Sequence, residues 1–330
     1  LRDWPNPDRD APFAKVYREA AEGRTYASAS PPSVTKVRPL DDVVIITTMK
    51  NEGPFILDWV AYHLSVGVTH FLVYTNDCTD PTCEILDALV DKGLVSRVDN
   101  PVEPGQRPQR IALELARGHP RVQAADAFIV MDVDEYINIH TGDGTLADLF
   151  AAAGDPDLIS MTWRFFGCNG IADYEDRPVA EQFTRAAPLG VRKPHHNWGF
   201  KTLVRKGAPF GKIGVHRPLS PETDRMTEWT NGSGQQMPVN YMAKGWRSNI
   251  DCWGYELVTL NHYAIRSLES FLVKRDRGRT NHIRRPQGVD YWNTFNRNDQ
   301  VDRSILQRLE RARLQRDAFA YDPDLAALHG

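Results

Sequence analysis

Cysteine is scarce in this sequence, and its spacing does not suggest a metal site. The chain of 330 residues has four cysteines (Cys78, Cys83, Cys168 and Cys252), and no two of them form a Cys-x-x-Cys pair. Because paired cysteines at short spacing are typical of zinc sites, their lack disfavours structural zinc. So few thiols favour reduced cysteines in a cytoplasmic protein.

Long apolar runs and an excess of positive charge are also lacking. No run approaches the ~18 apolar residues of a membrane span. No stretch has the form of a signal peptide, although a chain that begins at Leu1 leaves a trimmed terminus open. The formal net charge of −3 gives no global positive field for nucleic acid. The hydrophobic fraction of 41% suits a globular core, and the length suits one large domain with extensions or two modest domains.

Two glycine-rich phosphate-binding motifs are missing. No Gly-x-Gly-x-x-Gly follows the first predicted strand, where the sequence instead has Met-Lys-Asn-Glu-Gly-Pro at 49–54. The chain also has no Gly-x-x-x-x-Gly-Lys-Ser/Thr. These absences argue against a dinucleotide-binding fold and a P-loop.

What the sequence does contain is an alternation of strand and helix patterns. Predicted strands lie at 43–48, 70–74, 94–98, 127–131, 158–166 and 259–264, with further β-like runs at 179–186, 200–205 and 212–216. Predicted helices lie at 54–66, 81–91, 108–117, 144–153, 267–277 and 302–318, with a short one near 14–21. Alternation with short connections predicts an α/β fold with one mostly parallel sheet covered on both faces. The stretch 217–255 reads as a long loop.

The stretch 128–136, Phe-Ile-Val-Met-Asp-Val-Asp-Glu-Tyr, organises this pattern. An apolar run typical of a buried strand stops at Asp132, Asp134 and Glu135. If strand geometry persists, Asp132 and Asp134 point to the same side and repel unless a cation lies between them. Mg²⁺ or Mn²⁺ suits such a pair, and substrate phosphate oxygens complete its shell. The alternative is a strand that ends in a solvated acidic turn.

Polar segments at 47–52, 75–80 and 132–135 all follow predicted strands. The carboxyl ends of parallel strands meet at one edge of a sheet, so these segments are expected to converge there. That edge is where open α/β sheets bind nucleotides.

Five motifs in this order resemble a known family. They are Thr-Met-Lys-Asn-Glu at 48–52, Asn-Asp-Cys-Thr-Asp at 76–80, Met-Asp-Val-Asp-Glu-Tyr at 131–136, Trp-Arg-Phe-Phe-Gly at 163–167, and Asn-His-Tyr at 261–263 with Lys-Arg-Asp-Arg-Gly at 274–278. They resemble bacterial glycosyltransferase family 2-like proteins and are similar to family 92 (DUF23) galactosyltransferases. Cys78 departs from the pattern, which more often has Ser.

The resemblance covers roughly residues 42–280 and implies a GT-A fold. This fold has a Rossmann-like sheet, an acceptor-side subdomain of strands and loops, and C-terminal helices. It divides the chain into an N-terminal extension (1–41), a nucleotide-binding half (42–140), an acceptor half (141–280) and a helical tail (281–330). It also implies a nucleotide-sugar donor and a divalent metal held by the Asp-x-Asp motif.

The resemblance assigns donor and metal residues. Asp132 is expected to face the ribose and Asp134 to bind the metal, with Asp132 counted among the metal residues too. Six further residues are expected to contact the nucleotide: Thr48, Lys50, Asn51, Glu52, Asn76 and Asp77. The alternatives are strand-end capping for the first four and an Asx turn for the last two.

A late histidine often completes such a metal site, and His216 and His262 are the candidates. A lone histidine in a strand can instead be a satisfied core group. His195 and His196 are adjacent and would point opposite ways in an extended chain, so they are weaker candidates.

Positive side chains are expected at the diphosphate leaving group. Lys201, Arg205 and Arg217 are candidates. Residues 266–285 also hold seven positive and two negative side chains. Three interpretations of this stretch are open. It binds the diphosphate, it binds an anionic acceptor or the inner face of a membrane, or it forms a solvated helix face.

The acceptor side is less defined. Trp163, Arg164 and Trp198 are candidates for acceptor contact, since flat side chains stack on sugar rings. Transfer with inversion needs a base, for which the candidates are Asp173, Glu175, Asp224, Asp251 and Glu256, with Asp251, Asp173 and Glu175 preferred. Transfer with retention needs none.

The sequence therefore predicts a metal-dependent glycosyltransferase of polysaccharide biosynthesis. It would move a hexose from a nucleotide sugar, with UDP expected, to a hydroxyl of a cell-surface glycan or glycolipid. The alternatives are a sugar-phosphate nucleotidylyltransferase and a non-catalytic glycan-binding protein with a GT-A fold. The sequence does not name the sugar, the acceptor, the linkage, the stereochemical outcome or the oligomeric state.

Overall fold

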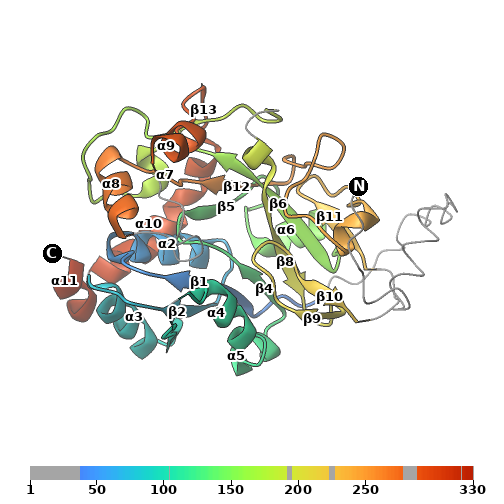
Figure 1. The fold of residues 1–330 in the computed structure, drawn as a ribbon, viewed down its shortest axis with the longest axis horizontal. Helices are drawn as coiled ribbons and strands as arrows, with labels where there is room; N and C mark the ends of the chain where they lie inside the picture. Colours follow the sequence, from blue (N-terminus) through green and yellow to red (C-terminus); the bar gives the residue numbers. More distant parts are fainter. Residues whose placement is uncertain are drawn as a thin grey trace, which may run out of the picture.

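The computed structural model describes residues 38–103, 105–191, 195–222, 227–277, 288–320 and 322–329. Its centre is a nine-stranded sheet in the order β3-β2-β1-β4-β8-β6-β12-β5, with β11 paired to β6 (Figure 1). Its strands are β1 (Val43–Met49), β2 (His70–Thr75), β3 (Val95–Asp99), β4 (Ala127–Val130), β5 (Glu135–Ile139), β6 (Leu158–Phe165), β8 (Phe200–Arg205), β11 (Trp229–Asn231) and β12 (Val258–His262). Two small sheets pair β7 (Arg185–Ala186) with β13 (Gln300–Val301) and β9 (Phe210–Lys212) with β10 (Leu219–Pro221).

Helices cover this sheet and form the C-terminal end of the chain. They are α2 (Gly53–Ser65), α3 (Thr82–Asp91), α4 (Pro108–Ala116), α5 (Pro120–Ala124), α6 (Leu146–Ala152), α7 (Val179–Gln182), α8 (Leu268–Arg277), α9 (Val289–Phe295), α10 (Leu309–Ala320) and α11 (Pro323–His329). The described residues also form the 3-10 turns η1 (His195–Trp198), η2 (Val239–Met242) and η3 (Ser304–Arg308).

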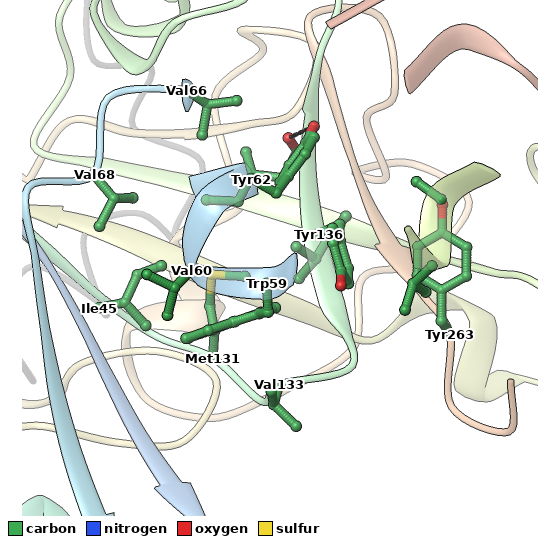
Figure 2. Packing of buried hydrophobic residues seen from close by; sticks show 14 of the residues in the cluster. Ile45, Trp59, Val60, Tyr62, Val66, Val68, Met131, Val133, Tyr136 and Tyr263 are labelled. Atoms are coloured by element: carbon green, nitrogen blue, oxygen red, sulfur yellow. Dashed lines mark hydrogen bonds between the residues drawn. The ribbon is translucent and has the colours of Figure 1, made fainter. Parts of the chain in front are cut away.

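The first four strands in space, β3, β2, β1 and β4, are parallel, as predicted. Alternate residues of β1 enter two different cores, because successive strand side chains point to opposite faces. Ile45 packs with Trp59 and Val60 of α2, which Figure 2 shows together with Met131. Ile46 packs with Leu113 of α4 on the other face. The predicted α/β sheet covered on both faces is confirmed.

The strand geometry does not persist through the acidic stretch, which corrects one expectation. β4 ends at Val130, and β5 begins at Glu135 at the edge of the sheet, with three strands (β8, β6 and β12) between the two. The intervening turn is closed by the Asp132 backbone N–H, which donates to Glu135 Oε2 at 2.9 Å. The Asp132 side chain is 42% exposed, whereas Asp134 is buried. Asp132 and Asp134 are therefore not alternate residues of one strand.

Other sequence predictions are met in part. The run 179–186 is the short helix α7 followed by β7, and in the run 212–216 only Lys212 belongs to a strand. Helix α8 forms as predicted, but Phe271 alone of its three expected core residues is buried, since Leu268 and Leu272 are 41% and 38% exposed. The helix expected at 302–318 forms as η3 and α10. The extension 1–37, with its expected helix near 14–21, lies outside the described residues.

The C-terminal helices pack onto the sheet domain. Helix α10 lies along α2 (Figure 1). The Asp302 carboxylate, just before η3, accepts from the guanidinium of Arg164 in β6, and both side chains are 8% exposed. Nowhere in the described part of the chain is a helix long and apolar enough to cross a bilayer. The expected cytoplasmic location stays a prediction.

The buried ion pair between Arg164 and Asp302 leads to a testable prediction about how the C-terminal helices are held on the sheet domain. Asp302→Ala should lower the free energy of unfolding by about 3 kcal/mol, because the Arg164 guanidinium would stay buried without its carboxylate. Chemical denaturation measures the change. Asp299→Ala removes a more exposed partner of Arg297 and should cost less than about 1 kcal/mol. Equal losses in the two variants would contradict the role given to the buried pair.

Candidate active site

The acidic turn after β4 gathers cations from two other parts of the chain. Strand β8 pairs with β4 and carries Lys201, whose side chain is fully buried. Its Nζ lies 3.2 Å from Asp132 Oδ2 and 3.5 Å from Glu135 Oε2. Burial alone would lower the pKa of Lys201, but Asp132 and Glu135 raise it above its ordinary value. Lys201 is therefore a permanent ammonium beneath the turn.

Glu135 is the most enclosed of the three acids. Its Oε1 accepts from Trp163 Nε1 at 2.7 Å, and its side chain is fully buried. Burial raises the pKa of Glu135 to about 7, although Lys201 partly offsets the effect. Both oxygens thus hold neighbouring groups in place, which suits an orienting role.

Asp134 faces α8 and β12. Its Oδ2 accepts from the Lys274 ammonium, which also donates to Ala264 O at 2.8 Å. Its Oδ1 lies 3.4 Å from His262 Nε2 and is buried without a hydrogen bond. Burial works to raise the pKa of Asp134, but Lys274 and then His262 hold it well below its ordinary range. Asp134 is therefore ionised, with one oxygen open toward the imidazole.

These residues fit the divalent ion that the resemblance implies. A carboxylate oxygen and an imidazole nitrogen face each other at 3.4 Å, and both are ordinary ligands of Mn²⁺. In the described ranges, no three acidic, histidine or cysteine side chains gather closely enough to hold a metal by themselves. Ions such as Mg²⁺ commonly bind through one or two protein carboxylates and complete their shell with substrate phosphates.

The second histidine candidate is placed differently. His216 Nδ1 lies 2.9 Å from the Phe200 carbonyl, and its ring packs against Trp163 and Trp246. Burial lowers the pKa of His216 to about 3, so it is neutral. Of the two, His262 is the one that the structure brings to Asp134.

The strand-end loops of β1 and β2 meet beside this turn, as the polar segments predict. Lys50 Nζ lies 3.7 Å from Asp77 Oδ2, and the Asn51 side chain makes two hydrogen bonds with Thr79. Asn51 and Asp77 adopt φ values of 52° and 49°, a left-handed conformation that Asn and Asp tolerate. Thr48 lies near the end of β1, and Asn76 directly follows β2.

Glu52 anchors α8 rather than presenting a free carboxylate. Arg266 lies 3.3 Å from its Oε2, and Arg277 donates to its Oε1. Arg277 also donates to the carbonyls of Lys50 and Asn51 at 2.6 and 2.5 Å. Since both oxygens of Glu52 are engaged, its predicted contact with base or ribose is not supported by this geometry.

Sequence reasoning found the cations of α8 but missed their partners. Arg266, Lys274 and Arg277 pair with Glu52 and Asp134 instead of forming a solvated face. The available signal was electrostatic, because acids at buried strand ends need counter-charges and 266–277 is rich in cations. Arg279, Arg284 and Arg285 lie outside the described residues. Gln109 of α4, whose Nε2 is 3.4 Å from Asp132 Oδ1, was also missed.

Two predicted diphosphate residues are held elsewhere. Arg205, at the far end of β8 from Phe200, pairs with Asp155 and donates to the Pro39 carbonyl at 2.7 Å. Arg217 is buried and donates to backbone carbonyls, including Ala243 O at 2.8 Å. Both guanidinium groups bind nearby carboxylate or carbonyl oxygens, so we do not retain either as a phosphate contact.

The residues predicted to contact the acceptor differ in how accessible they are. Trp163 is 8% exposed and Arg164 is paired with Asp302, so both belong to the core rather than to an open sugar-binding surface. Trp198 is half-buried, and its Nε1 donates to Val191 O at 2.7 Å. The side chains of His195 and His196 lie outside the described part of the structure.

The candidate bases are exposed where they are described, and the structure records no bond from them to the acidic turn within the described ranges. Glu175 pairs with Arg177, and the Asp251 backbone N–H donates to Asn249 Oδ1. Asp173 and Glu256 are exposed. Asp224 lies outside the described residues. The structure therefore brings none of these carboxylates to the acid cluster.

Comparison with known proteins agrees with one of the two family resemblances. A family model described as glycosyltransferase family 92 matches residues 43–231. A glycosyltransferase family 92 protein of Ricinus communis is 27% identical over 104 residues, which are 31% of this chain and 18% of that protein. The match thus spans less than a fifth of the relative's length. The bacterial family 2-like assignment gains no support from these matches.

Solved structures with a partial likeness to this chain include two complexes with nucleotide sugars. S. aureus TarS 1–349 in complex with UDP-GlcNAc has a TM-score of 0.32 and 15% identity, covering 62% of each chain. The mannosyltransferase PcManGT from Pyrobaculum calidifontis, in complex with GDP-Man and Mn²⁺, has a TM-score of 0.29 and 19% identity over 46% of this chain and 42% of that one. Likeness at this level carries no argument about the site. The family match covers more than half of the sequence and shows the family, although it assigns no site residue: the chain belongs to glycosyltransferase family 92.

Proposed function

We propose that this chain is a glycosyltransferase that binds a nucleotide-sugar donor at the carboxyl ends of β1, β2 and β4, with a divalent ion between Asp134 and His262. The observation that carries the proposal is the buried Asp134 Oδ1, which has no hydrogen bond and faces His262 Nε2 at 3.4 Å. When bound, the ion would supply positive charge at the departing diphosphate.

The charges around the acidic turn support a diphosphate ligand. Four cations, Lys201, Lys274, Arg266 and Arg277, surround three ionised acids, Asp132, Asp134 and Glu52, and the partly ionised Glu135. Because these charges are close to balance, the site can accept a complex of metal and diphosphate with little change of its net charge. Lys201 and Lys274 remain beside it as fixed cations, which favours the diphosphate as leaving group.

The finer assignments are part of the same proposal. The loops that hold Lys50, Asn51 and Asp77 would bind the nucleoside part of the donor, and UDP is the expected nucleotide. The transferred group is a hexose, and the acceptor is a hydroxyl of a cell-surface glycan or glycolipid. The nucleotidylyltransferase alternative is disfavoured by the loop 49–54, which is not glycine-rich.

Ligand-induced stabilisation tests donor binding. In a thermal-shift panel of UDP, GDP, CDP and their sugars, one nucleotide should raise the melting temperature with Mn²⁺ and do so much less with EDTA. A ligand at a hundred times its Kd stabilises the native state by about 2.7 kcal/mol, which is readily measured. Asp134→Asn should remove the Mn²⁺-dependent part, because it removes the charge that holds the ion. Asp99→Asn, an exposed acid at the end of β3, is the control. Unchanged Mn²⁺-dependent stabilisation in Asp134→Asn would refute the assignment.

The ion pair between Lys274 and Asp134 predicts that removing the Lys274 ammonium changes metal binding and nucleotide binding in opposite directions. Lys274→Met should tighten Mn²⁺ binding to the nucleotide-free protein by roughly tenfold, since Lys274 and the ion compete for the charge of Asp134. The same variant should weaken nucleotide binding, because the diphosphate loses a cation. Mn²⁺ titration followed by electron paramagnetic resonance measures the first effect and calorimetry the second. Arg275→Gln, an exposed neighbour on α8, should change neither. Weaker Mn²⁺ binding by Lys274→Met would contradict the competition.

A further inference from the structure

A pocket of about 650 Å³ lies along α4, on the side that faces residues 212–219. We call it the α4 pocket. Its wall on the helix runs from Arg107 to Arg117, which is about 15 Å of helical rise. Its opposite wall runs from Lys212 to Leu219. Pockets of several hundred Å³ are typical of ligand sites.

The rim of this pocket is strongly positive. Arg107, Arg110, Arg117 and Lys212 line it, against Glu114 as the one lining acid. Arg110 pairs with Glu114 at 3.1 Å, and Arg117 pairs with Glu222 at 3.6 Å, but all four side chains are more than half exposed. Such surface pairs are weak and leave the cations able to exchange partners. Within the described ranges, Arg107 and Lys212 have no ion pair.

The floor of the pocket is apolar. Leu113 of α4 is buried in the core beneath it, and Ile213 and Val215 pack against the same core from the other wall. Apolar walls with a few charged groups at the edge are the usual composition of a small-molecule or oligosaccharide site. The carbon-bearing faces of sugar rings can pack on such a floor while anionic substituents reach the rim.

The α4 pocket ends at the acidic turn. Gln109 lines it, and Gln109 Nε2 lies 3.4 Å from Asp132 Oδ1. His216 also lines it and packs against Trp163, which donates to Glu135. The nucleotide loops at 48–52 and 76–80 contribute no lining residue among those described. The pocket therefore reaches the place of transfer from a side other than the one assigned to the nucleotide.

We propose that the α4 pocket binds the acceptor, and that this acceptor is a glycan carrying carboxylate or phosphate groups. The proposal rests on the proposed function in one respect, because it places the transfer at the acidic turn. Arg107 and Lys212 would bind the anionic substituents, and Gln109 would lie beside the acceptor unit nearest to Asp132. A neutral glycan would leave Arg107 and Lys212 without an ion-pair partner within the described ranges.

Binding measurements on the whole chain test the proposal. An oligogalacturonate is the probe, and a maltooligosaccharide of equal length is its neutral match. The oligogalacturonate should bind more tightly by at least tenfold at low ionic strength, and its affinity should fall as salt rises, because exposed charges are screened. The double variant Arg107→Gln/Lys212→Gln should weaken oligogalacturonate binding roughly tenfold and leave UDP binding with Mn²⁺ unchanged.

The matched control removes two exposed arginines of α10, Arg311→Gln/Arg313→Gln, and should bind like the unmodified chain. Equal binding of the neutral probe, or no effect of the pocket variant, would overturn the proposal. A loss of UDP affinity in the pocket variant would assign the pocket to the donor instead. Equally tight, variant-sensitive binding of polyglutamate would show a general polyanion surface and overturn the glycan assignment. Oligogalacturonate binding without any nucleotide binding would support the pocket and refute the proposed donor site.

Discussion

Burying several carboxylates within one turn of chain is possible only if cations are buried with them, since an uncompensated buried charge costs several kcal/mol. Asp134 and Glu135 are buried beside the half-exposed Asp132, and Lys201 and Lys274 approach them from different elements. The antiparallel strand β8 beside β4 brings Lys201, and α8 brings Lys274. Both elements thus supply the counter-charges that this burial requires, and α8 also contacts the β1 loop through Glu52.

The path of the chain makes the acidic turn rigid. The turn leaves β4 in the parallel half of the sheet and enters β5 at the sheet's far end. Each end of the turn is thus fixed by a different part of the sheet. His262 of β12 pairs directly with Glu135 in the strand register, and the Tyr263 backbone N–H donates to Asp134 O at 2.8 Å. A residue more than a hundred positions later therefore has a set distance from the acids.

Local sequence patterns were enough for the parallel half of the fold and for the central acids. The apolar runs of β1, β2 and β4 are buried on both faces, and the polar residues after them have to meet at one edge. The partners of these acids could not be predicted in the same way. Lys274 contacts Asp134 only because β12 and the following helix α8 pack next to the acidic turn. Arg205 does not lie at the predicted diphosphate site, because it is at the end of β8 that faces Asp155. Such outcomes depend on long-range topology, which periodicity does not encode.

The place of β12 has a consequence for how this chain can be divided. The family match ends at residue 231, whereas β12 begins at Val258 and lies between β6 and β5. In the described structure β5 has no other strand neighbour, so a fragment ending at 231 would expose two strand edges inside its own sheet. Exposed edges of this kind promote aggregation. The segment by which the family is recognised is thus smaller than the segment that can fold as a unit, and expression of the former alone would yield an incomplete sheet.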